Sequence, residues 1–165
     1  MKIGLIGAGR LGICLALLLE RAGYEVLVSD IRSSYVTDLQ NKVISTNEPY
    51  VEDLLSSSKN LNATTDNLKV IQECDIIYTL VATPSNEDGS YNVDSVWKVV
   101  EDFKKLRCDR KSLVVGCTTN PGDCDEFQKS LSEYGVDVYY NPEFIAQGSI
   151  IKDLKSADMV LIGGE

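Results

Sequence analysis

A glycine-rich turn near the N-terminus separates two segments of different periodicity. Lys2–Ile6 is a short apolar run that predicts a β-strand, and it ends at Gly7-Ala8-Gly9-Arg10-Leu11-Gly12. The Leu- and Ala-rich stretch Arg10–Arg21 predicts a buried helix, and Glu25–Ser29 predicts a second strand that Asp30 closes. A G-x-G-x-x-G between a strand and a helix, with an acid at the end of the next strand, predicts a βαβ unit with parallel strands.

The same turn has the chemistry of a dinucleotide site. Gly7 permits the tight turn, Gly9 lets the backbone approach a pyrophosphate, and Gly12 lets the helix and strand pack closely. The N-terminus of the helix adds N–H donors and a positive dipole. Asp30 is expected to accept hydrogen bonds from the adenosine ribose, which favours NAD over NADP, although Arg32 offers a 2′-phosphate a guanidinium partner. The residues expected to bind the cofactor here are Gly7, Ala8, Gly9, Arg10, Leu11, Gly12, Asp30 and Arg32.

Strands and helices alternate along the rest of the chain. Further strands are predicted at 62–65, 75–81, 112–115, 136–140 and 159–162, and helices at 33–43, 50–58, 67–74, 93–106 and 125–134. The near-continuous apolar run at 75–81 is typical of a strand that is covered on both faces. We therefore expect an α/β fold, a Rossmann-type doubly wound, mostly parallel sheet with helices on both faces, forming one domain over residues 1–165.

Composition excludes several functional classes. The net charge of -9 repels phosphate backbones, so neither nucleic acid nor a membrane is expected as a partner. The absence of histidine excludes Ser-His-Asp and Cys-His catalysis and His-ligated metals within this chain, and no metal site is expected. Five cysteines without a C-x-x-C pair indicate free thiols. No apolar run approaches the ~20 residues of a membrane span and no signal peptide is visible, so a cytoplasmic location is expected.

Four further motifs stand at the ends of predicted elements. They are Val81-Ala82-Thr83-Pro84-Ser85, Cys117-Thr118-Thr119-Asn120-Pro121-Gly122, Asn141-Pro142-Glu143-Phe144-Ile145-Ala146-Gln147-Gly148-Ser149 and, before the helix at 50–58, Asn47-Glu48-Pro49. Together with the glycine turn, they resemble in order and spacing the N-terminal domain of the UDP-glucose/GDP-mannose dehydrogenase family. The corresponding family motifs are V-x-T-P, S-T-V-x-P-G, N-P-E-F-x-x-E-G and Y-E-P-G-L.

The resemblance implies a two-step oxidation of a nucleotide sugar of the UDP-glucose type to the uronate. The family uses two NAD and a cysteine that forms a thiohemiacetal and then a thioester; this cysteine lies in the family's second half, which this chain lacks. The resemblance also implies that the full-length protein is a homodimer or larger, and it assigns general-base work to Glu143 and the holding of a water to Thr118. By the same resemblance, Val81, Ala82, Thr83, Pro84, Ser85, Cys117, Thr118, Thr119 and Gln147 line the cofactor, and Glu143, Phe144, Ile145, Ala146 and Gln147 touch the substrate.

Three positions depart from the family pattern. Gln147 replaces the second glutamate of N-P-E-F-x-x-E-G, Tyr35 stands where a basic residue is common, and Tyr50 replaces the glycine of Y-E-P-G-L, which bears on loop shape. Cys117 is interpreted as a small filler residue because no activating base accompanies it. Two alternatives remain open at this point: a stand-alone NAD-sensing or regulatory module, and a Rossmann dehydrogenase of the 6-phosphogluconate or hydroxyacid type, which would not carry N-P-E-F.

Overall fold

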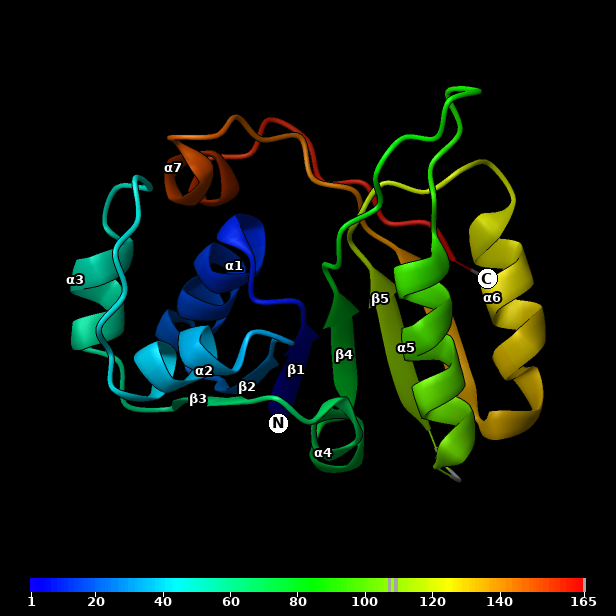
Figure 1. Ribbon diagram of the computed structural model, residues 1–165, viewed down its shortest axis with the longest axis horizontal. Coiled ribbons are helices and arrows are strands. Elements are labelled where there is room, and N and C mark those ends of the chain that lie inside the picture. The colour runs from blue at the N-terminus through cyan, green and yellow to red at the C-terminus, as the bar shows by residue number, and fades with distance from the viewer. Residues whose placement is uncertain (107, 109, 165) are drawn as a thin grey trace.

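A computed structural model describes residues 1–106, 108 and 110–164. Six parallel strands form one sheet in the order β3-β2-β1-β4-β5-β6 (Figure 1). The strands are β1 (Lys2–Ile6), β2 (Glu25–Ser29), β3 (Leu61–Thr64), β4 (Ile76–Thr79), β5 (Lys111–Val115) and β6 (Val136–Tyr140). The helices are α1 (Arg10–Arg21), α2 (Ser33–Gln40), α3 (Val51–Ser56), α4 (Asn67–Glu73), α5 (Asp94–Lys105), α6 (Asp123–Leu131) and α7 (Ile150–Lys155), with a 3-10 turn, η1 (Ser132–Tyr134).

Helices cover both faces of the sheet. α1 and α2 pack on one face, with α3 and α7 against α1, while α4, α5 and α6 cover the other face (Figure 1). Successive side chains of a strand point to opposite faces of the sheet, so one strand contributes buried residues to the core on both faces. In β2, Val26 and Val28 are buried on the α1 side and Leu27 is buried on the α4 side. The doubly wound fold predicted from the sequence is confirmed.

The chain leaves the centre of the sheet in two directions. β1 is followed outward by β2 and β3, and after α4 the chain returns to place β4 on the other side of β1. The connections that follow β1 and β4 therefore diverge, and a crevice opens between them at the carboxyl ends of the strands. The loops after β1, β4, β5 and β6, which carry the predicted motifs, all leave the sheet at this edge, at the top of Figure 1.

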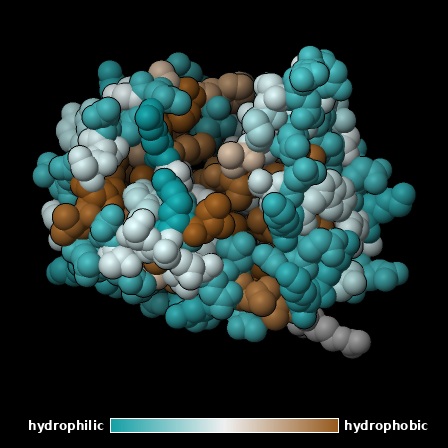
Figure 2. All heavy atoms as spheres, in the orientation of Figure 1, coloured by the Kyte–Doolittle hydropathy of each residue, from teal (hydrophilic) through white to brown (hydrophobic). Residues whose placement is uncertain are grey.

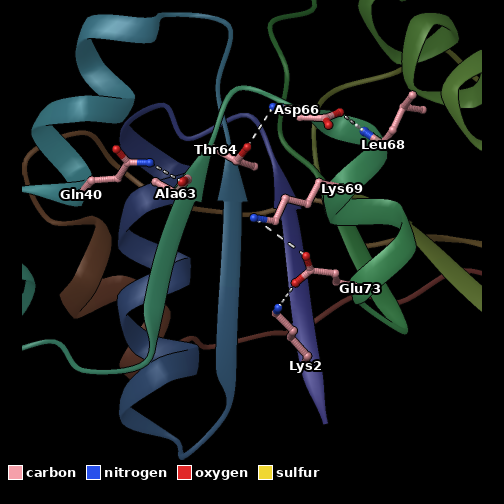
Figure 3. Close-up of polar contacts among 8 residues, drawn as sticks. All are labelled: Lys2, Gln40, Ala63, Thr64, Asp66, Leu68, Lys69 and Glu73. Atoms are coloured by element: carbon pink, nitrogen blue, oxygen red, sulfur yellow. Dashed lines mark hydrogen bonds and ion pairs between the residues drawn. The ribbon is translucent and has the colours of Figure 1, made fainter.

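Polar contacts fix the short elements beside the central strands (Figure 3). Asp66 caps α4 by accepting a hydrogen bond from the Leu68 N–H at 2.9 Å. At the other end of α4, Glu73 forms an ion pair with Lys2 of β1. Gln40 at the end of α2 donates to the Ala63 carbonyl of β3 at 2.8 Å. These contacts add to the apolar packing that holds α2 and α4 on the sheet.

One prediction for the C-terminal region is wrong, and one helix there was missed. No strand forms at 159–162: these residues lie outside the sheet and Val160 is 71% exposed, while the following residue, Gly163, forms an antiparallel bridge with Tyr140. Apolar composition alone does not make a strand, because a strand also needs a partner along its whole length. The helix α7 was not predicted, since its six residues are too few to show a clear period.

Element bounds also differ. The strand predicted at 75–81 spans only Ile76–Thr79, since the chain turns away to line the crevice. The helix predicted at 33–43 ends at Gln40, and Lys42 adopts a left-handed conformation (φ 59°). The helix predicted at 125–134 begins at Asp123 and its last turn is the 3-10 turn η1.

Candidate functional site

The glycine turn is built by three glycines with different surroundings. Gly7 has φ 98°, and a Cβ there would lie 2.6 Å from the Leu80 carbonyl oxygen. A Cβ on Gly12 would lie 2.1 Å from the Gly7 carbonyl oxygen, so α1 packs directly on the turn. A Cβ on Gly9 would meet no atom within 4 Å. Gly7 and Gly12 are therefore required by packing, whereas Gly9 keeps open the space in front of the N-terminus of α1.

Asp30 lies at the end of β2, beside the glycine turn, with only 9% of its surface exposed. Its Oδ2 accepts the Ala8 N–H at 3.2 Å, and its two oxygens accept the Arg32 Nε and Nη2 at 2.8 Å each. Burial alone would raise the pKa of Asp30, but the hydrogen bonds and charge of Arg32, with the Ala8 N–H, hold it below its ordinary value. The Arg32 guanidinium also lies over the Tyr35 ring, 4.2 Å from its centre. Position 35 lacks the basic residue that is common in the family pattern. Arg32 supplies a positive charge beside the Asp30 carboxylate instead.

A pocket of about 450 Å³ lies between Asp30 and α5. Figure 2 shows hydrophobic side chains gathered in the centre of this face of the molecule, with hydrophilic side chains around them. The walls of the pocket are mainly apolar, with polar groups from Ser29, Asn67, Ser95 and Lys98. None of these four was predicted, because nothing in their local sequence marks them; Asn67, Ser95 and Lys98 reach the pocket only through the packing of α4 and α5 on the sheet.

A second pocket, of about 280 Å³, lies on the other side of the glycine turn, where the loops after β4, β5 and β6 meet. It unites residues from four separate sequence motifs. Its lining is Leu11, Leu80, Val81, Thr83, Gly116, Cys117, Thr118, Pro142, Glu143 and Ile145. Both residues expected to be catalytic, Thr118 and Glu143, are therefore in one cavity with a residue of the glycine turn.

Burial controls the acid–base chemistry of this pocket. It raises the pKa of Glu143 above the ordinary glutamate value, which favours a carboxylate that accepts protons more readily. Burial and the charge of Glu143 also raise the pKa of Tyr78 on β4. Burial raises the pKa of Cys117 to about 12, so this thiol stays protonated near neutral pH. Cys117 therefore has no thiolate with which to act as a nucleophile, in agreement with its interpretation as a filler residue.

Several other predicted site residues lie at or beyond the rim. Ala82 lines the pocket beside Asp30, whereas Ser85 forms a bridge with Tyr91 in the long β4–α5 loop, with Pro84 preceding it. Thr119 turns toward α6, where its hydroxyl lies 3.9 Å from the Cys124 sulfur. Phe144 is 60% exposed.

Gln147 contacts the glycine turn directly. Its Oε1 accepts a hydrogen bond from Arg10 Nη1 at 2.7 Å, although the two residues are 137 positions apart. The neighbouring Ala146 N–H is held at 3.0 Å by Asp153 of α7. The loop after β6 is thus connected to the N-terminus of α1.

The two pockets adjoin, since Leu80 and Val81 line both of them. Between them the space in front of Gly9 and the N-terminus of α1 is open and could hold an anion, Asp30 presents a carboxylate acceptor beside it, and the pocket next to Asp30 has mainly apolar walls. Within the described residues, no helix combines the length and apolar character needed to cross a membrane.

Comparison with known proteins gives one consistent result. Residues 1–165 match the NAD binding domain of the UDP-glucose/GDP-mannose dehydrogenase family. The putative UDP-glucose 6-dehydrogenase YtcA of Bacillus subtilis is 28% identical over 99% of this chain and 39% of its own length. GDP-mannose 6-dehydrogenase of Pseudomonas syringae pv. syringae is 31% identical over 99% of this chain and 40% of its own length. The chain thus spans about two fifths of these relatives.

Solved structures show the same fold. The GDP-mannose dehydrogenase of Pseudomonas aeruginosa superimposes with a TM-score of 0.89 at 25% identity, covering 100% of this chain and 41% of that one. A 3-hydroxyisobutyrate dehydrogenase of Salmonella typhimurium, at TM-score 0.69 and 16% identity, covers 98% of this chain and 47% of that one and shares the fold alone. NAD is therefore the cofactor of this domain. The chain belongs to the UDP-glucose/GDP-mannose dehydrogenase family and is its NAD-binding domain.

Proposed function

We propose that this chain is the cofactor-binding part of a nucleotide-sugar 6-dehydrogenase that oxidises a UDP-sugar of the UDP-glucose type to the uronate in two NAD-dependent steps. The observation that carries the proposal is the shared pocket of Thr118 and Glu143, which adjoins the glycine turn. The similar proteins are named as dehydrogenases of UDP-glucose or GDP-mannose. A stand-alone NAD-sensing module finds no support among them.

The cofactor side of the site divides between the two pockets. The glycine turn would receive the pyrophosphate at Gly9 and the N-terminus of α1, and Asp30 would accept the adenosine ribose hydroxyls. Because Arg32 already pairs with this carboxylate, ribose binding requires the two to share or exchange hydrogen bonds. When bound, NAD accepts the hydride removed from the substrate.

The reacting end would lie in the pocket of Glu143. In the proposed reaction a cysteine from outside this chain holds the sugar as a thiohemiacetal and then as a thioester. Thr118 would hold a water there, and Glu143 would remove a proton from water as it attacks the thioester. The raised pKa of Glu143 suits a group that must accept this proton.

The remainder of the proposal concerns the whole protein. Residues 1–165 would form the NAD-binding domain, and a C-terminal half would supply the cysteine and read the nucleotide of the sugar. The full-length protein would be a homodimer or larger assembly.

Titration of the 165-residue chain with NAD, NADH and NADP by calorimetry tests the cofactor site. NAD and NADH are expected to bind, and NADP to bind more weakly, because a 2′-phosphate would face the Asp30 carboxylate. Asp30→Ala should weaken the binding of NAD and reduce the difference in affinity between NAD and NADP. Equal or tighter binding of NADP by the unmodified chain would contradict the assignment and identify Arg32 as a phosphate ligand.

A further inference from the structure

The loop between β6 and α7, residues 141–149, carries Glu143 into the pocket without any regular structure of its own. At its start, the Asn141 N–H donates to the Val115 carbonyl at 2.9 Å and the Asn141 amide donates to the Leu161 carbonyl at 2.9 Å. Arg10 holds Gln147 further along. The contact that fixes the far end comes from another part of the chain.

That contact is made by Glu48, in the loop before α3. Glu48 is 5% exposed. Its Oε1 accepts the Gly148 N–H at 2.7 Å, and its Oε2 lies 3.4 Å from the Ile150 nitrogen, 102 positions away. No Lys or Arg nitrogen among the described residues lies within 4.0 Å of this carboxylate. Its partners are therefore two backbone N–H groups, one at the end of the loop and one at the start of α7.

Burying a carboxylate costs free energy unless its oxygens are hydrogen-bonded, so Glu48 needs these N–H groups. The N–H groups need an acceptor in turn. Ile150 is the first residue of α7, whose first N–H groups need an acceptor from outside the helix. The side chain of Ser149 does not supply it: its hydroxyl accepts no N–H of α7 and instead donates to Asp153 at 2.7 Å. Glu48 fills this role, and Ile150 and Ile151 bury the same turn in the core.

Glu48 is itself firmly placed. Its own N–H donates to Thr46 Oγ1 at 3.2 Å. Three residues later the chain enters α3, where Val51 and Leu55 are fully buried against the α1 layer. The carboxylate is therefore presented to the loop from a rigid support rather than from a free side chain on the surface.

We propose that Glu48 is a positioning residue that sets the placement of the 141–149 loop and, through it, the contacts of this loop with the nicotinamide end of the cofactor. This inference rests on the proposed function. The pocket beside Asp30 contains neither Glu48 nor any residue of the loop. The loop reaches the glycine turn through the exposed contact of Gln147 with Arg10. The adenosine end should therefore depend less on Glu48 than the nicotinamide end does. Removal of the Glu48 carboxylate should weaken the binding of ligands that reach the loop and leave the binding of shorter ligands nearly unchanged.

The test compares NADH with ADP-ribose, which lacks the nicotinamide, in calorimetric titrations of the 165-residue chain. Glu48→Ala is expected to weaken the affinity for NADH by about tenfold, or about 1.4 kcal/mol. The affinity for ADP-ribose should change by less than about twofold. Glu48→Gln, which retains one carbonyl acceptor, should recover part of the loss. Glu52→Ala is the matched control, because Glu52 lies nearby in α3 and, among the described residues, its carboxylate accepts only the exposed Thr46 N–H.

Hydrogen exchange separates this inference from the proposed function. In Glu48→Gln the amides of Gly148 and Ile150 should lose protection while those of the sheet keep it, and unchanged protection would overturn the proposal. An equal loss of NADH and ADP-ribose affinity, or no loss of either, would also overturn it. Where Glu48→Ala does not fold, Glu48→Gln carries the same comparison. If the unmodified chain binds neither ligand, the proposed function fails, and hydrogen exchange alone decides whether Glu48 holds the loop.

Discussion

At the scale of single residues, the three glycines of the first turn have separable roles. Gly9 has an extended backbone and open space around its missing Cβ, so Gly9→Val should leave the fold intact. The added methyl groups would fill the space through which a pyrophosphate reaches the α1 N–H groups. NAD affinity is expected to fall by about 100-fold or more, which corresponds to about 2.7 kcal/mol.

Gly12→Ala supplies the contrast, because its Cβ would overlap the Gly7 carbonyl oxygen. Gly12→Ala should have a lower melting temperature than the unmodified chain, measured by circular dichroism. Gly9→Val should keep the melting temperature of the unmodified chain. NAD binding by Gly9→Val at the affinity of the unmodified chain would show that the pyrophosphate lies elsewhere.

Glu143 is the residue on which the chemistry of the proposed reaction depends most. In the full-length enzyme, Glu143→Gln keeps the size of the side chain but removes the base, so thioester hydrolysis should slow by about 10²–10⁴-fold. The first hydride transfer should suffer less. A burst of NADH followed by a slow steady rate, with a covalent adduct visible by mass spectrometry, is the expected result.

The pH dependence of the same step follows from the raised pKa of Glu143. As pH falls through that value the base becomes protonated, so hydrolysis should decline at a higher pH than an ordinary glutamate would give. Unchanged turnover in Glu143→Gln, with no accumulated adduct, would show that Glu143 is not the base. The N-P-E-F motif would then mark only a binding loop.

At the scale of elements, the start of α3 contains an avoidable strain. Tyr50 precedes this helix with φ 70°, a left-handed conformation, at the position where the family pattern has glycine. Such a conformation costs a residue with a Cβ about 1–2 kcal/mol. The Tyr50 side chain is 65% exposed, so its removal loses little buried area.

Tyr50→Gly should therefore stabilise the chain, by about 1 kcal/mol or about 2–4 °C in melting temperature. Tyr50→Ala is the control, since it removes the ring but keeps the Cβ that causes the strain. A lower melting temperature for Tyr50→Gly than for Tyr50→Ala would show that the ring, not the backbone, governs this turn.

At the scale of the whole molecule, this chain is expected to bind cofactor without turning over a sugar nucleotide. Burial raises the pKa of Cys14 and Cys117 to about 12 and that of Cys74 to about 11, so these thiols stay protonated near neutral pH. The same cause raises the pKa of Cys108 and Cys124. Purified chain with NAD and UDP-glucose should give no steady NADH absorbance at 340 nm; sustained production would contradict the proposed division of labour.

Much of this arrangement was predictable from local sequence. The glycine turn, the acid after β2 and the buried strands each depend on neighbours a few residues away, because turn geometry and side-chain periodicity are local properties. The family resemblance implied that Thr118 and Glu143 belong to one site, and they line one pocket because parallel strands bring the loops after them to the same edge of the sheet.

Other features were decided only by the tertiary structure. The contribution of Lys98 to the pocket beside Asp30 and the burial that raises the pKa of Glu143 depend on which surfaces meet after packing. The segment at 159–162 shows the reverse case, because its apolar residues predicted a strand but lie outside the sheet, and the single bridge to β6 is made by the following residue, Gly163. Glu48 and Gly148 are 100 positions apart, and only the folded chain makes one the support of the other. Sequence specified the local conformations, whereas long-range contacts and burial decided how they act together.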